Sequence, residues 1–260
     1  MSSQDLDDLN VQSPMRKLAQ QILSPDQGRP HESMKKIGLV GGISWVSTLD
    51  YYRYINEGIN RRLGGLDFAE CLIYSLNFGD VQRAGWNDAG PLLLRAAQTL
   101  EQGGADAIVL CANTAHRFAD ELRAALRIPL LHIVEATAAV IEAQQLRTVG
   151  LLGTKVTMES SFFVDGLAAA GIKTLVPETV ETRDYIQHTL KEELGRGVLR
   201  EDTKSRYLRV MQELIDRGAE GIVLGCTEIP LLIEQRDVDV PLFDTTRIHA
   251  EAAVAFACES

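Results

Sequence analysis

The stretch Gly218-Ala-Glu-Gly-Ile-Val-Leu-Gly-Cys-Thr-Glu-Ile-Pro230 decides the fold. Its apolar run Ile222-Val-Leu224 lies between Gly221 and Gly225, a pattern typical of a short strand that is buried on both faces of a parallel sheet. The next residue, Cys226, therefore follows the carboxyl end of a strand, where open α/β sheets bind their ligands. We predict that Cys226 is a functional thiol.

The same pattern occurs earlier in the chain, in a segment that begins 114 residues before Gly218 and reads Gly-Ala-Asp-Ala-Ile-Val-Leu-Cys-Ala-Asn-Thr over 104–114. Two further segments return 112 residues later, 37–42 at 149–154 and 128–131 at 240–243. Three matches in the same order indicate an internal duplication with a long period, unlike a short-period solenoid. They predict two similar α/β lobes whose corresponding strand ends face each other across a shared cleft.

Strand and helix patterns alternate along both halves, which favours a parallel sheet flanked by helices in each. Strands are expected at 36–40, 71–76, within 104–114, and at 129–134, 148–152, 173–176, 221–224 and 240–243. Helices are expected at 47–63, 92–102, 116–126, 135–145, 158–170, 183–194, 203–217 and 246–257, with a loop at 77–87. We expect residues 34–145 to form the first lobe, whose closing helix can cross over, and 146–260 the second. Residues 1–33 are expected to be a disordered extension, in which 15–23 could form a short helix.

Charge and cysteine usage exclude several classes of function. The net charge of -10 argues against nucleic acid or an anionic membrane surface as the main partner. The four cysteines show no Cys-x-x-Cys pair and no metal-like spacing with histidine, so we expect no metal and a reduced, cytoplasmic compartment. There is no apolar run of about 20 residues, as a membrane span requires, and no secretory signal pattern.

The glycines of the first strand and turn, Gly38, Gly41 and Gly42, fit neither a P-loop nor a dinucleotide fingerprint. The better interpretation is a tight turn that lets backbone amides and Ser44 approach a small ligand.

Four motifs together resemble the aspartate/glutamate racemase family, the cofactor-independent amino-acid racemases, over nearly all of the chain from Lys36 to Cys258. They are Gly41-Gly42-Ile43-Ser44-Trp45 with Ser47-Thr48, Asn113-Thr114-Ala115-His116, Gly225-Cys226-Thr227-Glu228, and Phe243-Asp244-Thr245 with Ile248-His249-Ala250. The resemblance implies proton removal from one face of the α-carbon and return to the other by two thiols, one from each lobe, with neither pyridoxal phosphate nor a metal. It also implies a homodimer.

The resemblance further implies a set of substrate contacts. Asn113, Thr114 and Thr227 would hold the α-carboxylate, beside Ala115 of the same motif, and Ile43 and Ser44 would close the pocket. Arg196, or alternatively Arg83, would bind the distal carboxylate of aspartate or glutamate. The alternatives that do not involve a substrate are helix capping for the threonines, solvated surface positions for the arginines, and structural roles for His116 and His249.

The sequence departs from the family pattern at the first thiol. The position directly before Asn113-Thr114 is Ala112, and the internal repeat independently pairs Cys226 with Ala112 and Gly225 with Cys111. Because consecutive residues of an extended chain point to opposite faces, Cys111 would point away from the substrate unless the turn rotates it back. Cys111 could therefore replace the missing thiol, Cys226 could act with water or a substitute side chain, or proton delivery could be one-sided.

Cys226 itself lies before an expected helix whose first turn holds Thr227 and Glu228, and a helix start would make the thiol more acidic. The alternative is a small buried hydrophobe. We expect a racemase of aspartate, glutamate or a similar small amino acid, with catalytic Cys226 and candidate Cys111. The alternatives are a single-cysteine decarboxylase or isomerase, and an amino-acid-binding protein without catalytic activity.

Overall fold

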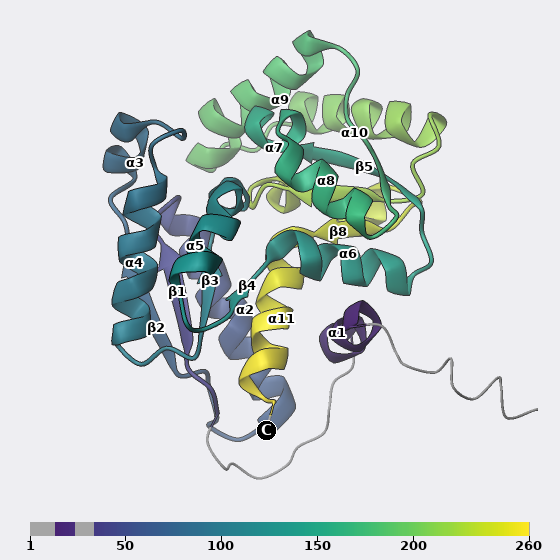
Figure 1. Cartoon of the computed structure of the whole chain (residues 1–260). Coiled ribbons are helices and arrows are strands. Elements are labelled where there is room, and N and C mark those ends of the chain that lie inside the picture. Colours follow the sequence, from purple (N-terminus) through teal and green to yellow (C-terminus); the bar gives the residue numbers. More distant parts are fainter. Residues whose placement is uncertain (1–13, 24–33, 260) are drawn as a thin grey trace, which may run out of the picture.

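Two parallel sheets with the same strand order form the centre of the protein (Figure 1). The computed structural model describes residues 14–23 and 34–259. The first sheet has the order β2-β1-β3-β4 and the second β6-β5-β7-β8. The strands are β1 (Ile37–Gly41), β2 (Cys71–Ser75), β3 (Ala107–Leu110), β4 (Leu130–Leu131), β5 (Thr148–Gly153), β6 (Lys173–Leu175), β7 (Ile222–Gly225) and β8 (Leu242–Asp244). This confirms the predicted α/β fold with two similar halves.

The pairing registers of the two sheets are equivalent. Gly38 of β1 lies opposite Ile108 of β3, and Gly150 of β5 lies opposite Ile222 of β7. On the other side, Ile108 is opposite Leu130 and Ile222 is opposite Leu242. These are the positions that the sequence repeat aligns, so Cys111 and Ala112 after β3 correspond to Gly225, the last residue of β7, and to Cys226.

Helices cover both faces of each sheet, as the doubly buried strands require. The α-helices are α1 (Pro14–Leu23), α2 (Trp45–Leu63), α3 (Phe78–Ala84), α4 (Gly90–Gln102), α5 (Ala119–Ala125), α6 (Ile133–Ala143), α7 (Lys155–Glu159), α8 (Ser161–Ala169), α9 (Val180–Glu192), α10 (Glu201–Asp216) and α11 (Thr245–Ala257). Short 3-10 turns are η1 (Asn113–Phe118), η2 (Leu194–Arg196), η3 (Ile229–Leu231) and η4 (Gln235–Asp237).

The last helix of each half packs against the sheet of the other half. Ala250 and Val254 of α11 pack with Leu39 of β1 and with α2 in one core cluster. Ile133 of α6 packs with Leu151 of β5 in another, and α6 also contacts α11 (Figure 1). The expected lobe boundary between residues 145 and 146 stays a prediction. It separates the residues of the two sheets, although α6 and α11 each pack against the opposite half.

Part of the expected N-terminal extension is a packed helix. α1 lies against α6 and α11, and Ala19 and Ile22 are buried there (Figure 1). Residues 15–23, for which a short helix was an open possibility, are therefore helical. The expectation of disorder for 1–13 and 24–33 lies outside the described residues.

Two local predictions were wrong. The segment 77–87 contains helix α3, which Asn77 caps by accepting a hydrogen bond from the Gly79 amide. A helix of 7 residues is too short to show a clear apolar period in the sequence. The single helix expected at 158–170 is two helices, α7 and α8, with Ser160 in extended conformation between them.

The turn after β1 depends on Gly42. Its φ is 82°, and a Cβ there would lie 2.1 Å from the carbonyl oxygen of Leu76. We expect Gly42→Ala to lower the free energy of unfolding by about 3 kcal/mol, from backbone strain and the clash together. Gly85→Ala is the control, because Gly85 has φ 74° with open space around it, and we expect about 1 kcal/mol. Chemical denaturation measures both changes, and an equal loss of unfolding free energy in Gly42→Ala and Gly85→Ala would contradict the clash.

Candidate active site

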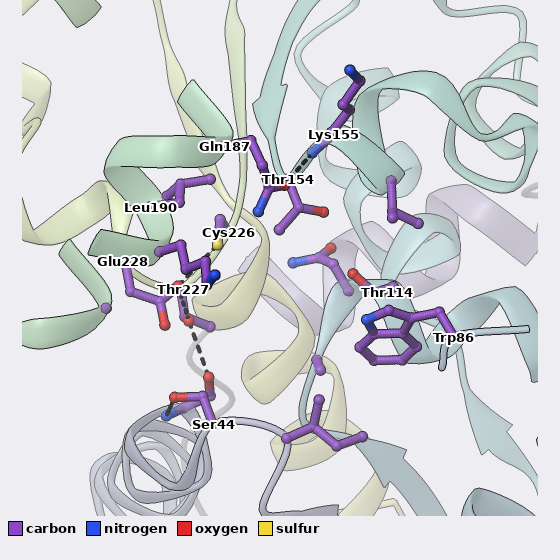
Figure 2. Close-up of a pocket in the computed structure, with 18 of the residues that line it drawn as sticks. Ser44, Trp86, Thr114, Thr154, Lys155, Gln187, Leu190, Cys226, Thr227 and Glu228 are labelled. Carbon is purple, nitrogen blue, oxygen red and sulfur yellow. Dashed lines mark hydrogen bonds between the residues drawn. The ribbon is translucent and has the colours of Figure 1, made fainter. Parts of the chain in front are cut away.

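A cavity of about 1030 Å³ opens where the carboxyl ends of both sheets face each other (Figure 2). The first half contributes the turn after β1, the start of α2, the α3 region and the turn after β3, with Ile43, Ser44, Trp45, Val46, Ser47, Phe78, Gln82, Trp86, Ala112, Asn113 and Thr114. The second half contributes the α7 and α9 regions and the turn after β7, with Thr154, Lys155, Val156, Glu159, Ser160, Gln187, Leu190, Lys191, Gly195, Gly225, Cys226, Thr227 and Glu228. The predicted cleft between the halves is therefore present.

Cys226 faces this cavity directly after β7 and is half-buried. Its thiol donates a hydrogen bond to Oε2 of Glu228 at 2.9 Å. The hydroxyl of Thr227 donates to the same oxygen at 2.8 Å (Figure 2). The cavity thus contains a thiol in direct contact with a carboxylate that can accept its proton.

The expected helix after Cys226 is absent from the described structure, where only the short turn η3 follows. In an α-helix that begins at Cys226, the amide of residue 230 would donate to the Cys226 carbonyl. Residue 230 is a proline, which has no amide hydrogen, so this bond cannot form. Instead the Ile229 amide bonds that carbonyl at 3.3 Å. The prediction of a more acidic thiol was therefore wrong: burial, and then the negative charge of Glu228, raise the pKa of Cys226.

Ala112 lies on the cavity wall of the first half, and Cys111 does not. Cys111 is 0% exposed and packs with Leu39 and Val109 in the core beneath α2 and α11. Burial raises the pKa of its thiol far above the ordinary range. The assignment of Cys111 as a catalytic candidate is therefore corrected, because strand alternation directs its side chain to the opposite face of the sheet.

Most of the predicted substrate contacts line the cavity. Ile43, Ser44, Asn113, Thr114 and Thr227 do so. Ala115 does not; it is buried in the core between the first sheet and α4.

Neither predicted arginine lines the cavity. The side chain of Arg196 is 65% exposed and pairs with Glu192 at 2.5 Å, and exposed Arg83 pairs with Asp80 on α3. Both lie just beyond lining residues, Gly195 and Gln82. Arg196 lies in the short turn η2, after α9 has ended at Glu192.

The first-half wall offers polar groups suited to a carboxylate or amino group. Ser44, with φ 67°, caps the 19-residue helix α2 and accepts a hydrogen bond from the Ser47 amide. The side-chain amide of Asn113 donates to Thr245 at 3.1 Å. Its Oδ1 is buried without a partner among the described residues. A bound ligand could satisfy this oxygen.

Sequence reasoning missed two parts of the wall. Gln187, Leu190 and Lys191 lie on one face of α9 at spacings of three and four, a helical period that groups them in the sequence without showing which face meets the cavity. Phe78, Gln82 and Trp86 follow a spacing of four in and after α3, in the segment expected to be a loop.

The charges around the cavity are distributed unequally. Of the lining residues, those with ionisable side chains all come from the second half: Lys155, Glu159, Lys191, Cys226 and Glu228. The lining residues of the first half carry no ionisable side chain. Any acid or base that the protein itself supplies from this described wall must therefore come from the side of Cys226.

His116 and His249 lie behind the first-half wall. His249 donates from Nε2 to the Leu131 carbonyl, so its Nδ1 accepts from the Tyr51 hydroxyl at 2.8 Å. Burial lowers the pKa of His249 to about 3. His116 donates from Nδ1 to the Ala112 carbonyl and its ring lies edge-on to His249. Neither ring lines the cavity.

The described residues, 14–23 and 34–259, hold no group of three histidine, cysteine or acidic side chains placed to bind a metal ion. They also include no helix with the length and hydropathy of a membrane span.

The fold and the site together define a class: two-lobed α/β proteins of duplicated architecture that present a thiol and a carboxylate to a cleft between the lobes. The family model for Asp/Glu/Hydantoin racemase matches residues 40–253. This chain belongs to the Asp/Glu/hydantoin racemase family.

Individual relatives agree with this assignment. A crystal structure of a candidate Asp/Glu racemase from Yersinia pestis is 42% identical with a TM-score of 0.83, covering 87% of this chain and 100% of its own. An aspartate racemase homologue from Pyrococcus horikoshii OT3 is 36% identical with a TM-score of 0.79, again covering 87% and 100%. The broad specificity amino-acid racemase RacX of Bacillus subtilis (strain 168) is 24% identical over 228 residues, 84% of this chain and 96% of its own.

Proposed function

We propose that this protein racemises a small amino acid, aspartate or glutamate, without pyridoxal phosphate, and that Cys226 moves the α-proton. The observation that carries the proposal is the Cys226 thiol, which faces the cavity while donating a 2.9 Å hydrogen bond to Glu228. General acid–base catalysis needs such a group within reach of the substrate carbon. The family and the names of its relatives support the same reaction class.

The thiol must first lose its proton, because its pKa is raised and a thiolate is the reactive base. Glu228 is the acceptor in contact with it: the proton passes from Sγ to Oε2, leaving a thiolate beside a carboxylic acid. The thiolate then takes the α-proton and becomes a thiol again, and the electron pair of the broken C–H bond stays on the substrate. Ser44, Asn113 and Thr114 supply polar groups that can hold the substrate carboxylate while this charge develops.

The opposite face of the substrate would lie against Ala112, which has no proton to give. Since the described first-half lining lacks ionisable side chains, we propose that water delivers the second proton. Racemisation would then be lopsided: exchange of the α-proton by Cys226 would be faster than inversion. This arrangement also favours a second candidate function, one-sided proton delivery after decarboxylation, as a single thiol suffices for that step.

A distal carboxylate needs a cation, and the cavity lining offers Lys155 and Lys191. The Lys155 ammonium is 2.5 Å from Asp184, so its charge is already paired. The Lys191 side chain is 73% exposed and its ammonium is 3.5 Å from Glu192, a looser pair. We propose Lys191, in place of Arg196, as the side chain that favours aspartate or glutamate.

We expect Lys191→Met to raise the KM for aspartate about tenfold, because a hydrogen bond to a charged group contributes about 1.5 kcal/mol or more. Steady-state racemisation with chiral separation measures it. Arg196→Met is the matched control, and its KM should stay within about twofold because exposed ion pairs contribute little. A larger effect from Arg196→Met than from Lys191→Met would contradict the assignment.

We also propose a cytoplasmic homodimer. Cys71, Cys111 and Cys226 are free thiols, which fits a reducing compartment. Trp45, Leu49 and Tyr52 form an exposed stripe on α2 that a second copy could cover.

A panel of L- and D-amino acids, assayed by chiral separation without added pyridoxal phosphate, tests the function. We expect aspartate or glutamate to lose optical purity and alanine to remain nearly unchanged. Carbon dioxide release without racemisation would favour the decarboxylase, and binding without either reaction would identify a silent binding protein.

A further inference from the structure

We propose that Ser47 of the first half is a positioning residue that orients the hydrogen bonds of the Cys226–Glu228 pair by acting through Thr227. The proposal rests on the proposed function, because it concerns the same thiol. Ser47 lies in the first turn of α2, is 2% exposed, and its hydroxyl is 3.0 Å from the hydroxyl of Thr227 in the second half.

Counting hydrogens fixes the direction of this contact. Thr227 has one hydroxyl hydrogen, and it donates that hydrogen to Glu228 Oε2 at 2.8 Å, since a carboxylate oxygen accepts. The Thr227 oxygen can therefore act toward Ser47 as an acceptor alone, so the Ser47 hydroxyl is the donor. The donor sequence is Ser47 to Thr227 to Glu228, and the Cys226 thiol donates to that same carboxylate oxygen.

Glu228 Oε2 accepts from both the Thr227 hydroxyl and the Cys226 thiol, so two donors share one carboxylate oxygen. Without Ser47, the Thr227 hydroxyl loses the donor that holds its orientation and can rotate away from Glu228. The Cys226 thiol then no longer shares Oε2 with Thr227, so its hydrogen bond to the carboxylate strengthens and its proton passes to Oε2 more readily.

This series of hydrogen bonds also spans the cleft between the two halves. Ser47 is held by a helix that packs on the first sheet, whereas Thr227 and Glu228 follow a strand of the second. Separation of the two halves at the cavity would break the Ser47 contact. The readiness of Cys226 to give up its proton is thereby linked to the distance between the halves at the cavity.

The test is the rate at which iodoacetamide alkylates Cys226 in the full-length protein, followed by mass spectrometry of the peptide containing Cys226 across a range of pH. Thr227→Val removes one donor from Oε2 and should speed alkylation near neutral pH about fivefold, the equivalent of one ordinary hydrogen bond. Ser47→Ala should speed it about threefold and shift the rate profile to lower pH. Ser205→Ala, a half-buried serine of α10 away from the cavity, should leave the rate unchanged.

The double variant decides whether Ser47 acts through Thr227. We expect Ser47→Ala to add nothing in the Thr227→Val background, because the group that transmits its effect is gone. An unchanged alkylation rate in Ser47→Ala, or the same increase with and without the Thr227 hydroxyl, would overturn the proposal. Ser47→Thr keeps the donor and should restore the wild-type pH profile even if its added methyl group raises KM. Alkylation needs no turnover, so this test can fail while the proposed racemase stands, and the reverse.

Discussion

Cys226→Ser is expected to abolish exchange of the substrate α-proton, with a loss of at least about 1,000-fold in rate. A serine hydroxyl occupies the same place in the cavity and can still donate to Glu228, so binding and fold should persist. It loses its proton far less readily than a thiol does, even the Cys226 thiol, whose pKa burial and Glu228 raise. The measurement is loss of the α-proton signal of aspartate or glutamate in deuterated water.

The matched control is Cys71→Ser. Cys71 is a half-buried cysteine at the start of β2, outside the cavity lining. It should keep wild-type exchange, and both variants should unfold within about 1 kcal/mol of wild type. Normal exchange in a folded Cys226→Ser protein would remove this thiol from the mechanism.

Ala112→Cys is expected to raise two-way racemisation about 100-fold, the contribution of one well-placed acid or base. Ala112 lines the cavity at the position that corresponds to Cys226 in the other half. A sulfur added there would face the substrate from the opposite side, where the described wall now has no ionisable group. Chiral separation of products from both L- and D-substrate measures the change.

Cys111→Ala tests the same register, that is, which of residues 111 and 112 faces the cavity. Cys111 packs in the core and points away from the cavity, so its removal should leave racemisation within about twofold and cost about 1 kcal/mol of stability. A folded Ala112→Cys protein with no gain in either direction, or a large loss of activity in Cys111→Ala, would show that the register is wrong.

The repeat in the sequence predicted more of the site than any single motif. It aligned β3 with β7 residue by residue, and the pairing of Ile108 and Ile222 with their neighbours follows the same alignment. From this alignment and strand alternation, it could be anticipated that Ala112 faces the cavity and that Cys111 faces the core. These features depend on backbone periodicity, which short sequence segments encode.

The features that failed depend on how the chain ends an element or turns a helix face toward the cavity. Pro230 replaces a helix start after Cys226 with the short turn η3, which removes the expected acidification of the thiol. The position of Lys191 was not anticipated because the phase of α9 relative to the cavity is set by packing on the second sheet. Glu228 was expected in the first turn of a helix, and its contact with the thiol is a tertiary detail.

The most direct test of one-sided chemistry is to incubate each enantiomer of aspartate and glutamate separately with the wild-type enzyme in deuterated water and to separate the enantiomers at early times. If Cys226 removes and returns the proton on one face, one of the two enantiomers should take up deuterium faster than its mirror image accumulates. Deuterium confined to the newly formed mirror image from both starting enantiomers, with unlabelled starting amino acid remaining, would require a second protein base opposite Cys226 and would contradict this account.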